Sequence, residues 1–268
     1  MYRQRFGLSG HPFPKNATGK TLFTEHDGYR RLERNFQILC DEPGLGLLTA
    51  EPGCGKTAAI RNLAQALPRP QYAVIYLCDT TIGPTDVYRT LASELGLKPA
   101  HRRGTLWRDI KARAERMVEE RNERPLLIID EAQHLSDSFF SDLSGFLNFA
   151  FDSRDLFTTW LVGLPPLRAR LKHQCHVALQ SRIVASVHLE AFSRETFQEF
   201  LLHGLSAVGA KGTLIADSAR ELLFRASRGQ SRTAGKTLRR ALRIAHEREQ
   251  SFVDDMVMEA AIAEVAQL

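Results

Sequence analysis

The sequence predicts an α/β protein in which a parallel sheet flanked by helices is followed by a smaller all-helical domain. Up to about residue 190, short apolar runs alternate with segments of helical periodicity, which is the pattern of a parallel sheet with helical crossovers. The run at residues 126–129 is apolar at every position, as in a strand that is buried on both faces. From Ser193 onward the periodicity is helical only, so the sheet is expected to end before that point.

The apolar runs define five predicted strands, at residues 45–49, 72–78, 125–129, 157–162 and 184–189. Between them, helices are predicted at residues 57–67, 84–95 and 104–118, where apolar side chains recur every three or four positions. Phe139, Phe140, Leu143, Phe146 and Leu147 form a further stripe at helical spacing, which we interpret as core. Helices of the second domain are predicted at residues 193–208, 216–227, 232–249 and 254–265.

The composition is that of an ordinary folded protein. The chain has 268 residues, 43% hydrophobic and 25% charged, which excludes disordered, collagen-like and low-complexity proteins. Its 36 basic and 31 acidic side chains leave a formal charge of +5, too small to indicate a partner by itself. Four widely spaced cysteines argue against a disulfide scaffold. Because neither a signal peptide nor a membrane-spanning run is found, we expect a cytoplasmic protein with no membrane partner.

The first predicted strand leads directly into Thr-Ala-Glu-Pro-Gly-Cys-Gly-Lys-Thr, residues 49–57, and then into a predicted helix. Glycines in such a loop let backbone N–H groups turn toward one anion, and the helix N-terminus adds its positive dipole end. Lys56 can reach the outer phosphates and the Thr57 hydroxyl can bind Mg²⁺, so the loop predicts a P-loop for ATP, with Ala50 replacing the usual leading glycine. The expected nucleotide-binding residues are Glu51, Pro52, Gly53, Cys54, Gly55, Lys56 and Thr57.

Two acidic residues, Asp130 and Glu131, follow the fully apolar strand directly. The carboxyl ends of parallel strands form the ligand-binding edge of a sheet, so both carboxylates are expected beside the P-loop. There Asp130 would hold Mg²⁺ through water and Glu131 would polarise the water that attacks the outer phosphate. The pair therefore indicates nucleotide hydrolysis, and an acidic turn without a chemical role is the alternative.

These motifs resemble those of the AAA+ superfamily, and more narrowly a bacterial branch of ExeA-type ATPases and ATPase partners of transposases, relatives of Mu B protein and TnsC. Weaker matches are Phe6-Gly7-Leu8 with Pro12-Phe13, residues 130–135, residues 161–167, Gln180-Ser181-Arg182 and Gly229-Gln230-Ser231-Arg232. The resemblance implies a P-loop AAA+ parallel sheet flanked by helices, followed by a smaller all-helical lid. The implied domains are a leader over residues 1–40 that packs on the ATPase domain, an AAA+ nucleotide-binding domain over 41–191 and a lid over 192–268.

The resemblance also implies roles for two arginines. Arg182 matches the position from which AAA+ proteins present an arginine finger to the ATP of a neighbouring subunit, where it neutralises transition-state charge. Arg232 matches the sensor 2 arginine of the lid, which closes over the phosphates. The implied enzyme is an oligomeric Mg²⁺-dependent ATPase, a ring or a helical filament, with Glu131, Arg182 and Arg232 catalytic and with Thr57 and Asp130 at the metal. At both arginines, an ordinary surface residue is the alternative.

Sensor 1 departs from the pattern of the relatives. They commonly place a polar residue after the glycine of the fourth strand, whereas this chain has Leu164 after Gly163. Thr158 and Thr159 are the possible substitutes, and slow or partner-dependent hydrolysis is the expected consequence.

Positive charge gathers in two stretches. The first holds Lys98, Arg102, Arg103, Arg108, Lys111, Arg113 and Arg116. The second, residues 211–250, holds ten basic residues against four acidic ones. Relatives that assemble on DNA follow the phosphate backbone with basic and hydroxyl residues near the first stretch, so Lys98, Arg102, Arg103 and Thr105 are the expected DNA-binding residues. A solvated basic face is the alternative.

The function that the resemblance implies is ATP-dependent binding of an oligomer to double-stranded DNA, which regulates target selection and recruits a transposase. ATP binding would favour assembly on the duplex, and hydrolysis would favour disassembly. One alternative is an ExeA-like ATPase of a secretion or envelope complex, which would act on proteins. The other is an initiator-like DNA loader, because the context of Ser181-Arg182 also resembles initiator ATPases.

His173, Cys175 and His176 are the residues of the sequence that cluster like metal ligands. Three ligands within four residues give poor geometry for a tetrahedral zinc site. We therefore expect no zinc here and interpret the three as polar residues near a loop.

Overall fold

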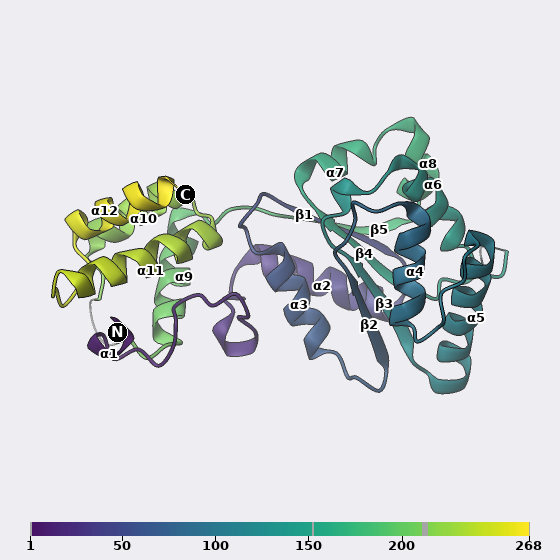
Figure 1. Cartoon of the computed structure of the whole chain (residues 1–268), viewed down its shortest axis with the longest axis horizontal. Helices are drawn as coiled ribbons and strands as arrows, with labels where there is room; N and C mark the ends of the chain where they lie inside the picture. Colours follow the sequence, from purple (N-terminus) through teal and green to yellow (C-terminus); the bar gives the residue numbers. More distant parts are fainter. Residues whose placement is uncertain (1, 152, 211–213, 268) are drawn as a thin grey trace. The chain divides into compact units, whose positions relative to one another are not determined.

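The computed structural model describes residues 2–151, 153–210 and 214–267, and the chain divides into two compact units. The sheet unit contains residues 28–50 and 63–189, and the helical unit contains residues 1–27, 51–62 and 190–268. Each unit has a hydrophobic core of its own. Figure 1 shows the order of the helices and strands along the chain.

Five parallel strands form the sheet, in the spatial order β2-β3-β4-β1-β5. They are β1 (Leu45–Ala50), β2 (Tyr72–Leu77), β3 (Arg124–Ile129), β4 (Thr158–Gly163) and β5 (Ile183–Leu189). Because all neighbours are parallel, every carboxyl end lies at one edge of the sheet and every amino end at the other. Each strand overlaps one of the five predicted runs, and the helices around it confirm the predicted fold class.

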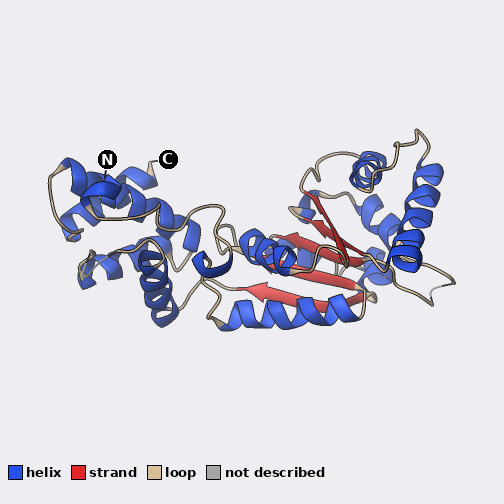
Figure 2. Ribbon diagram, turned by 90° about the horizontal axis from the view of Figure 1, so that it is seen from below, coloured by secondary structure: helices blue, strands red, loops and turns tan. Residues whose placement is uncertain are grey.

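Helices cover both faces of the sheet, as Figure 2 shows. The helices on one face are α4 (Pro84–Glu94), α5 (Arg103–Arg121), α6 (Asp137–Phe146) and α7 (Pro165–Arg170). Short segments complete the connections: η2 (Ala132–His134), η3 (Gln174–His176) and α8 (Val177–Gln180). On the other face lies α2 (Asp27–Asp41), where Phe36 stacks on Trp160 with ring centroids 6.0 Å apart. A Cβ on Gly46 would lie 2.7 Å from the Trp160 ring, so β1 requires glycine at this position.

Four helices form most of the helical unit. They are α9 (Arg194–Ser206), α10 (Asp217–Ser227), α11 (Ser231–Glu247) and α12 (Asp255–Ala266). Two of them begin with side-chain caps, because Ser193 Oγ accepts from the Thr196 N–H at 3.2 Å and Asp254 Oδ1 accepts from the Val257 N–H at 2.8 Å. No helix in the part of the chain that the structure describes is both long enough and apolar enough to cross a membrane.

The first 27 residues of the predicted leader belong to the helical unit, and Tyr2, Leu8 and Phe23 lie in its core. It contains α1 (Tyr2–Arg5) and the 3-10 turn η1 (Gly19–Thr21), and α3 (Lys56–Ala66) begins in the same unit. Phe13 stacks on Phe200 with ring centroids 4.3 Å apart, and its ring fills the space that a Cβ on Gly204 would occupy. Residues 28–41, by contrast, lie in the sheet unit as most of α2. The domain boundaries after residues 40 and 191 stay predictions.

Candidate functional site

The loop after β1 has the backbone conformation that a P-loop requires. Gly53 and Gly55 have φ values of +85° and +90°, which glycine adopts without strain. α3 begins directly after them at the buried Lys56, and the Ala59 N–H donates to the Gly55 carbonyl at 2.9 Å. The loop thus presents a helix N-terminus and a lysine, which are the groups that bind phosphates.

α11 begins against this loop, within the helical unit. The Ser231 hydroxyl donates to the Gly53 carbonyl at 2.8 Å, and the Arg232 N–H donates to the same oxygen at 3.1 Å. A Cβ on Gly53 would lie 3.2 Å from the Arg232 Cβ, so the glycine also permits this close approach. The backbone of Arg232 therefore lies beside the loop, as a sensor 2 residue must, and its catalytic role stays a prediction.

Cys54 lies between the two glycines and is partly buried. A helix N-terminus by itself lowers the pKa of a thiol. Burial instead raises the pKa of the Cys54 thiol, and the nearby Glu51 carboxylate raises it further. Cys54 is therefore a poor nucleophile at neutral pH.

Asp130 and Glu131 directly follow β3, at the same edge of the sheet at which β1 ends. Asp130 is buried, and its carboxylate accepts hydrogen bonds from Tyr76 Oη at 2.9 Å and from the Glu131 N–H at 2.9 Å. Tyr76 reaches Asp130 because it lies on β2, where it pairs with Ile128 of β3. Burial and the Asp130 carboxylate raise the pKa of Tyr76, so its hydroxyl stays a hydrogen-bond donor.

Glu131 is held through both its main chain and its side chain. Its φ of +53° is uncommon for a residue other than glycine. Thr80 Oγ1 donates to the Glu131 carbonyl at 2.9 Å, and Gln133 Nε2 donates to Glu131 Oε2 at 2.6 Å. Residues fixed in sparsely populated conformations cluster at functional sites, so this geometry favours a role for the Glu131 carboxylate.

Gln133 connects Glu131 with the end of β4. Its Oε1 accepts a hydrogen bond from the Leu164 N–H at 3.1 Å, just beyond the last residue of the strand. A Cβ on Gly163 would lie 2.6 Å from that oxygen, so glycine is needed to admit the Gln133 side chain. The polar group at the end of β4 is therefore supplied by Gln133, which is not among the predicted catalytic or nucleotide-binding residues.

The expectation that Thr158 or Thr159 replaces sensor 1 is wrong. Both residues begin β4, and Thr159 pairs with Leu45, the first residue of β1. The Thr158 hydroxyl is buried and donates to the Leu39 carbonyl at 2.7 Å. The two threonines thus lie at the amino edge of the sheet, whereas Asp130 and Glu131 lie at the carboxyl edge.

Arg182 lies immediately before β5, at the amino edge of the sheet. It lines a cavity of about 640 Å³ together with Ser144, Asn148 and Asp155. A strand of six or seven residues spans roughly 20 Å, so the Arg182 backbone is about that far from Glu131 of its own subunit. This separation excludes a contact between Arg182 and its own acidic pair, and the predicted role toward a neighbouring subunit remains open.

The four expected DNA-binding residues lie at the start of α5 and in the loop before it. Lys98 and Arg102 are exposed, and Thr105 is partly buried in the first turn of the helix. Arg103 is engaged in a different way, because its guanidinium donates to Asp142 Oδ2 at 2.5 Å and lies over the Trp107 ring at 5.6 Å. Lys98 and Arg102 are therefore better placed than Arg103 to contact a polyanion.

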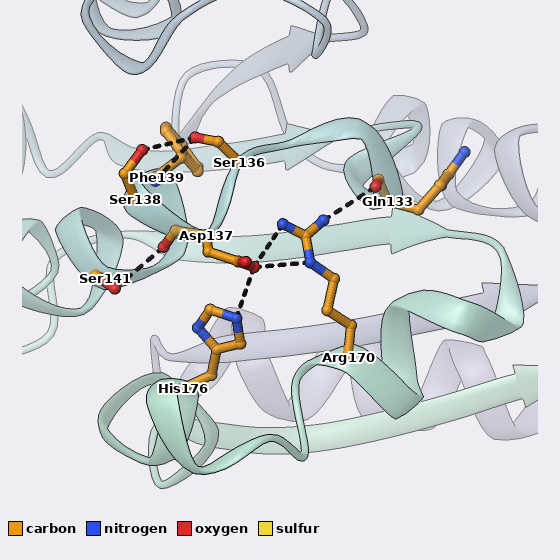
Figure 3. Close-up of polar contacts among 8 residues, drawn as sticks. All are labelled: Gln133, Ser136, Asp137, Ser138, Phe139, Ser141, Arg170 and His176. Carbon is orange, nitrogen blue, oxygen red and sulfur yellow. Dashed lines mark hydrogen bonds and ion pairs between the residues drawn. The ribbon is translucent and has the colours of Figure 1, made fainter.

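The segment with His173, Cys175 and His176 does not hold a metal-ligand cluster. Among the described residues, no three His, Cys, Asp or Glu side chains are placed to bind a metal ion. His173 and Cys175 are exposed, but His176 is buried, which corrects its interpretation as a polar loop residue. Its Nε2 lies 2.9 Å from Asp137 Oδ1, in the network that Figure 3 shows.

A parallel sheet with the order of this one, a glycine-rich loop after β1 and an acidic pair after β3 define the P-loop AAA+ fold. In agreement, residues 40–171 match the family model described as AAA domain. This match covers the first four strands of the sheet and includes both nucleotide motifs.

Among curated proteins, the chain is similar to general secretion pathway protein A of Aeromonas hydrophila. The two are 29% identical over 245 residues, which is 90% of this chain and 44% of the relative. The chain therefore spans less than half the length of that relative.

Solved structures with the same fold include the ORC2 protein of Aeropyrum pernix in ADPNP and ADP complexes. Its TM-score is 0.73 at 16% identity, with 97% of this chain and 72% of that chain covered. The ORC1 protein of Aeropyrum pernix in complex with DNA has a TM-score of 0.68 at 15% identity, with 91% and 66% covered. At these identities the likeness concerns the fold alone.

Proposed function

We propose that this protein is a Mg²⁺-dependent ATPase that assembles as an oligomer on double-stranded DNA. The observation that carries the ATPase proposal is the acidic pair after β3, in which Asp130 is buried and hydrogen-bonded and Glu131 is fixed by Gln133. The positive φ values of Gly53 and Gly55 before Lys56 support nucleotide binding at the loop after β1.

The side chains fit ATP and Mg²⁺ by their chemistry. Mg²⁺ prefers oxygen ligands, and the Thr57 hydroxyl and the Asp130 carboxylate supply them, directly or through water. When bound, the metal ion neutralises phosphate charge and orients the outer phosphate for attack. In this proposal Lys56 binds the outer phosphates, Glu131 orients the water, and Arg232 and the Arg182 of a neighbouring subunit stabilise the developing charge.

Gln133→Ala is expected to leave ATP affinity unchanged and to slow hydrolysis roughly 10- to 100-fold, because a displaced Glu131 no longer orients the water. Titration with a fluorescent ATP analogue and a phosphate-release assay measure the two quantities. His134→Ala is the matched control, since His134 is the exposed next residue. Normal turnover by Gln133→Ala would show that the 2.6 Å contact with Glu131 is not needed for chemistry.

The DNA part of the proposal rests on exposed positive charge. Lys98 and Arg102 offer cations at the start of α5, where phosphate contacts would give affinity with little base specificity. The similarity of fold to an ORC1 protein solved in complex with DNA supports the DNA-binding proposal. We further propose, from the resemblance to transposition ATPases, that the assembled protein regulates target selection and recruits a transposase, in the cytoplasm.

A second candidate is an ATPase of a secretion or envelope complex that acts on proteins. It is favoured by the similarity to general secretion pathway protein A, which extends over 90% of this chain. An initiator-like DNA loader is the third candidate, and it rests on likeness of fold to ORC proteins. ATP-stimulated DNA binding separates the first and third candidates from the second.

The DNA proposal predicts that ATP or a slowly hydrolysed analogue increases affinity for two unrelated duplexes about equally. The variant Lys98→Ala/Arg102→Ala is expected to bind more weakly, and its plot of log affinity against log salt should be shallower by roughly 0.9 per lost phosphate contact. Fluorescence anisotropy over a salt series measures both effects.

This variant keeps the contact between Arg103 and Asp142, so α5 stays joined to α6. The control Arg116→Ala/Arg121→Ala removes the same charge from exposed positions near the other end of α5. An equal loss in both variants would indicate a general charge effect. No ATP-stimulated DNA binding by the wild type would rule out the DNA proposal.

A further inference from the structure

Three donors converge on one carboxylate oxygen at the start of α6. Arg170 Nε and Nη2 donate to Asp137 Oδ1 at 2.8 and 2.6 Å, and His176 Nε2 lies 2.9 Å from the same oxygen (Figure 3). The hydrogen bonds from Arg170 and then from His176 lower the pKa of Asp137, so the carboxylate is charged at neutral pH. Asp137 therefore joins α7, which carries Arg170, to η3, which carries His176.

The same arginine reaches the segment of the acidic pair. Arg170 Nη1 donates to the Gln133 carbonyl at 3.2 Å, as Figure 3 shows. The side chain of Gln133 in turn donates to Glu131 Oε2 at 2.6 Å. A continuous path of hydrogen bonds thus runs from the Glu131 carboxylate through Gln133 and Arg170 to Asp137.

The other end of the path leads toward Arg182. Asp137 is the first residue of α6, and the cavity that Arg182 lines includes Ser144 of that helix and Asn148 just beyond it. His176 directly precedes α8, and the Arg182 N–H donates to the carbonyl oxygen of Leu179 in α8 at 3.1 Å. Both segments therefore start at the network and end at the Arg182 cavity.

Two members of the network, His176 and Arg170, pack on one buried ring, whereas the Asp137 side chain is 65% exposed. The His176 side chain is only 1% exposed, and its ring meets Phe140 edge-on with centroids 5.3 Å apart. The Arg170 guanidinium lies over the same Phe140 ring at 5.0 Å. A buried aromatic ring between two members of the network leaves them little freedom to move independently.

We propose that Asp137, with Arg170 and His176, is a positioning residue that couples Glu131 of one subunit to the Arg182 that the same subunit presents to its neighbour. The inference rests on the proposed ATPase function. A shift of Glu131 in one nucleotide site would change the placement of Arg182 at the next, through Gln133, Arg170 and Asp137.

The test is a double-mutant cycle of Asp137→Asn with Arg182→Ala, read by ATPase rate, ATP affinity and melting temperature. Asp137→Asn alone should leave ATP affinity unchanged and reduce turnover roughly tenfold, the size expected within one hydrogen-bond network. In the Arg182→Ala background, the fold reduction in turnover caused by Asp137→Asn should be at least three times smaller than in the wild-type background. Arg170→Lys, which keeps the charge but loses the two-pronged contact, should behave as Asp137→Asn does.

Asp86→Asn is the matched control. Asp86 also lies in the first turn of a helix and pairs with an arginine, Arg89, at 2.7 Å, but none of its hydrogen bonds or ion pairs within the described residues involves Glu131, Gln133 or Arg170. It should change turnover less than twofold in either background.

Equal fold losses from Asp137→Asn in the wild-type and Arg182→Ala backgrounds would overturn the coupling, as would unchanged turnover in both Asp137→Asn and Arg170→Lys. A wild type without ATPase activity, or an Arg182→Ala protein with full activity, would instead overturn the proposed function and this inference with it.

Discussion

Lys56→Ala is expected to lose most of its ATP binding. Lys56 is buried at the start of α3, directly after two glycines with positive φ, so its removal takes away the cation that the loop presents at the helix N-terminus. Removal of one partner of a desolvated charge pair costs about 2–5 kcal/mol. The dissociation constant for ATP should therefore rise roughly 30-fold to several thousand-fold.

Titration with a fluorescent ATP analogue measures this loss. Lys20→Ala is the matched control, since Lys20 is an exposed lysine of the leader in the same unit. Glu131→Gln is the functional contrast: it should bind ATP normally, hydrolyse it roughly 100-fold or more slowly because the general base is lost, and prolong the assembled state. If Lys56→Ala kept wild-type affinity, the loop after β1 would not be the nucleotide site.

The nucleotide motifs could be predicted because each is contiguous in the sequence. A strand, a glycine-rich loop and a helix follow one another at residues 45–66, and a buried strand runs directly into Asp130 and Glu131. Local order is enough to recognise such signals, since the chemistry needs those residue types side by side.

The residues that hold the acidic pair could not be found in that way. Tyr76 meets Asp130 only because β2 pairs with β3, and Gln133 meets Leu164 only because β4 ends beside η2. Spacing along the chain contains neither pairing. The wrong expectation for Thr158 and Thr159 has a related cause. Both begin β4, and the first residues of a parallel strand lie at the amino edge of the sheet, away from the acidic pair.

The sequence of α2 has the apolar spacing of an amphipathic helix, which the predicted leader does not take into account. Residues 1–40 are predicted as a leader, yet Tyr29, Leu32, Phe36 and Leu39 recur at helical spacing and are all buried in α2. The sheet needs this helix, because α4 to α7 cover only its other face. When the predicted helices cover only one face of a sheet, the preceding sequence should therefore be searched for an amphipathic helix that covers the other.

Arg182→Ala is expected to bind ATP with normal affinity and to hydrolyse it roughly 1,000-fold more slowly, the effect of losing an arginine finger. The reason is geometric. Arg182 precedes β5 at the amino edge of the sheet, whereas Asp130 and Glu131 follow β3 at the carboxyl edge, roughly 20 Å away along the strands. An arginine so far from its own acidic pair can act on ATP only at the site of another subunit.

A mixing experiment tests this prediction without any assumption about the shape of the oligomer. Lys56→Ala lacks a working nucleotide site but keeps Arg182, and Arg182→Ala has the opposite defect. At a mixed junction the intact site of one subunit meets the intact arginine of the other, so phosphate release from the mixture should exceed the sum of the two separate proteins. The control mixture is Lys56→Ala with Lys56→Ala/Arg182→Ala, in which every nucleotide site lacks Lys56 and no activity should return. If mixing restores nothing, and if the specific activity of the wild type does not depend on protein concentration, then Arg182 does not act between subunits and its place beside the cavity at the amino edge must have another purpose.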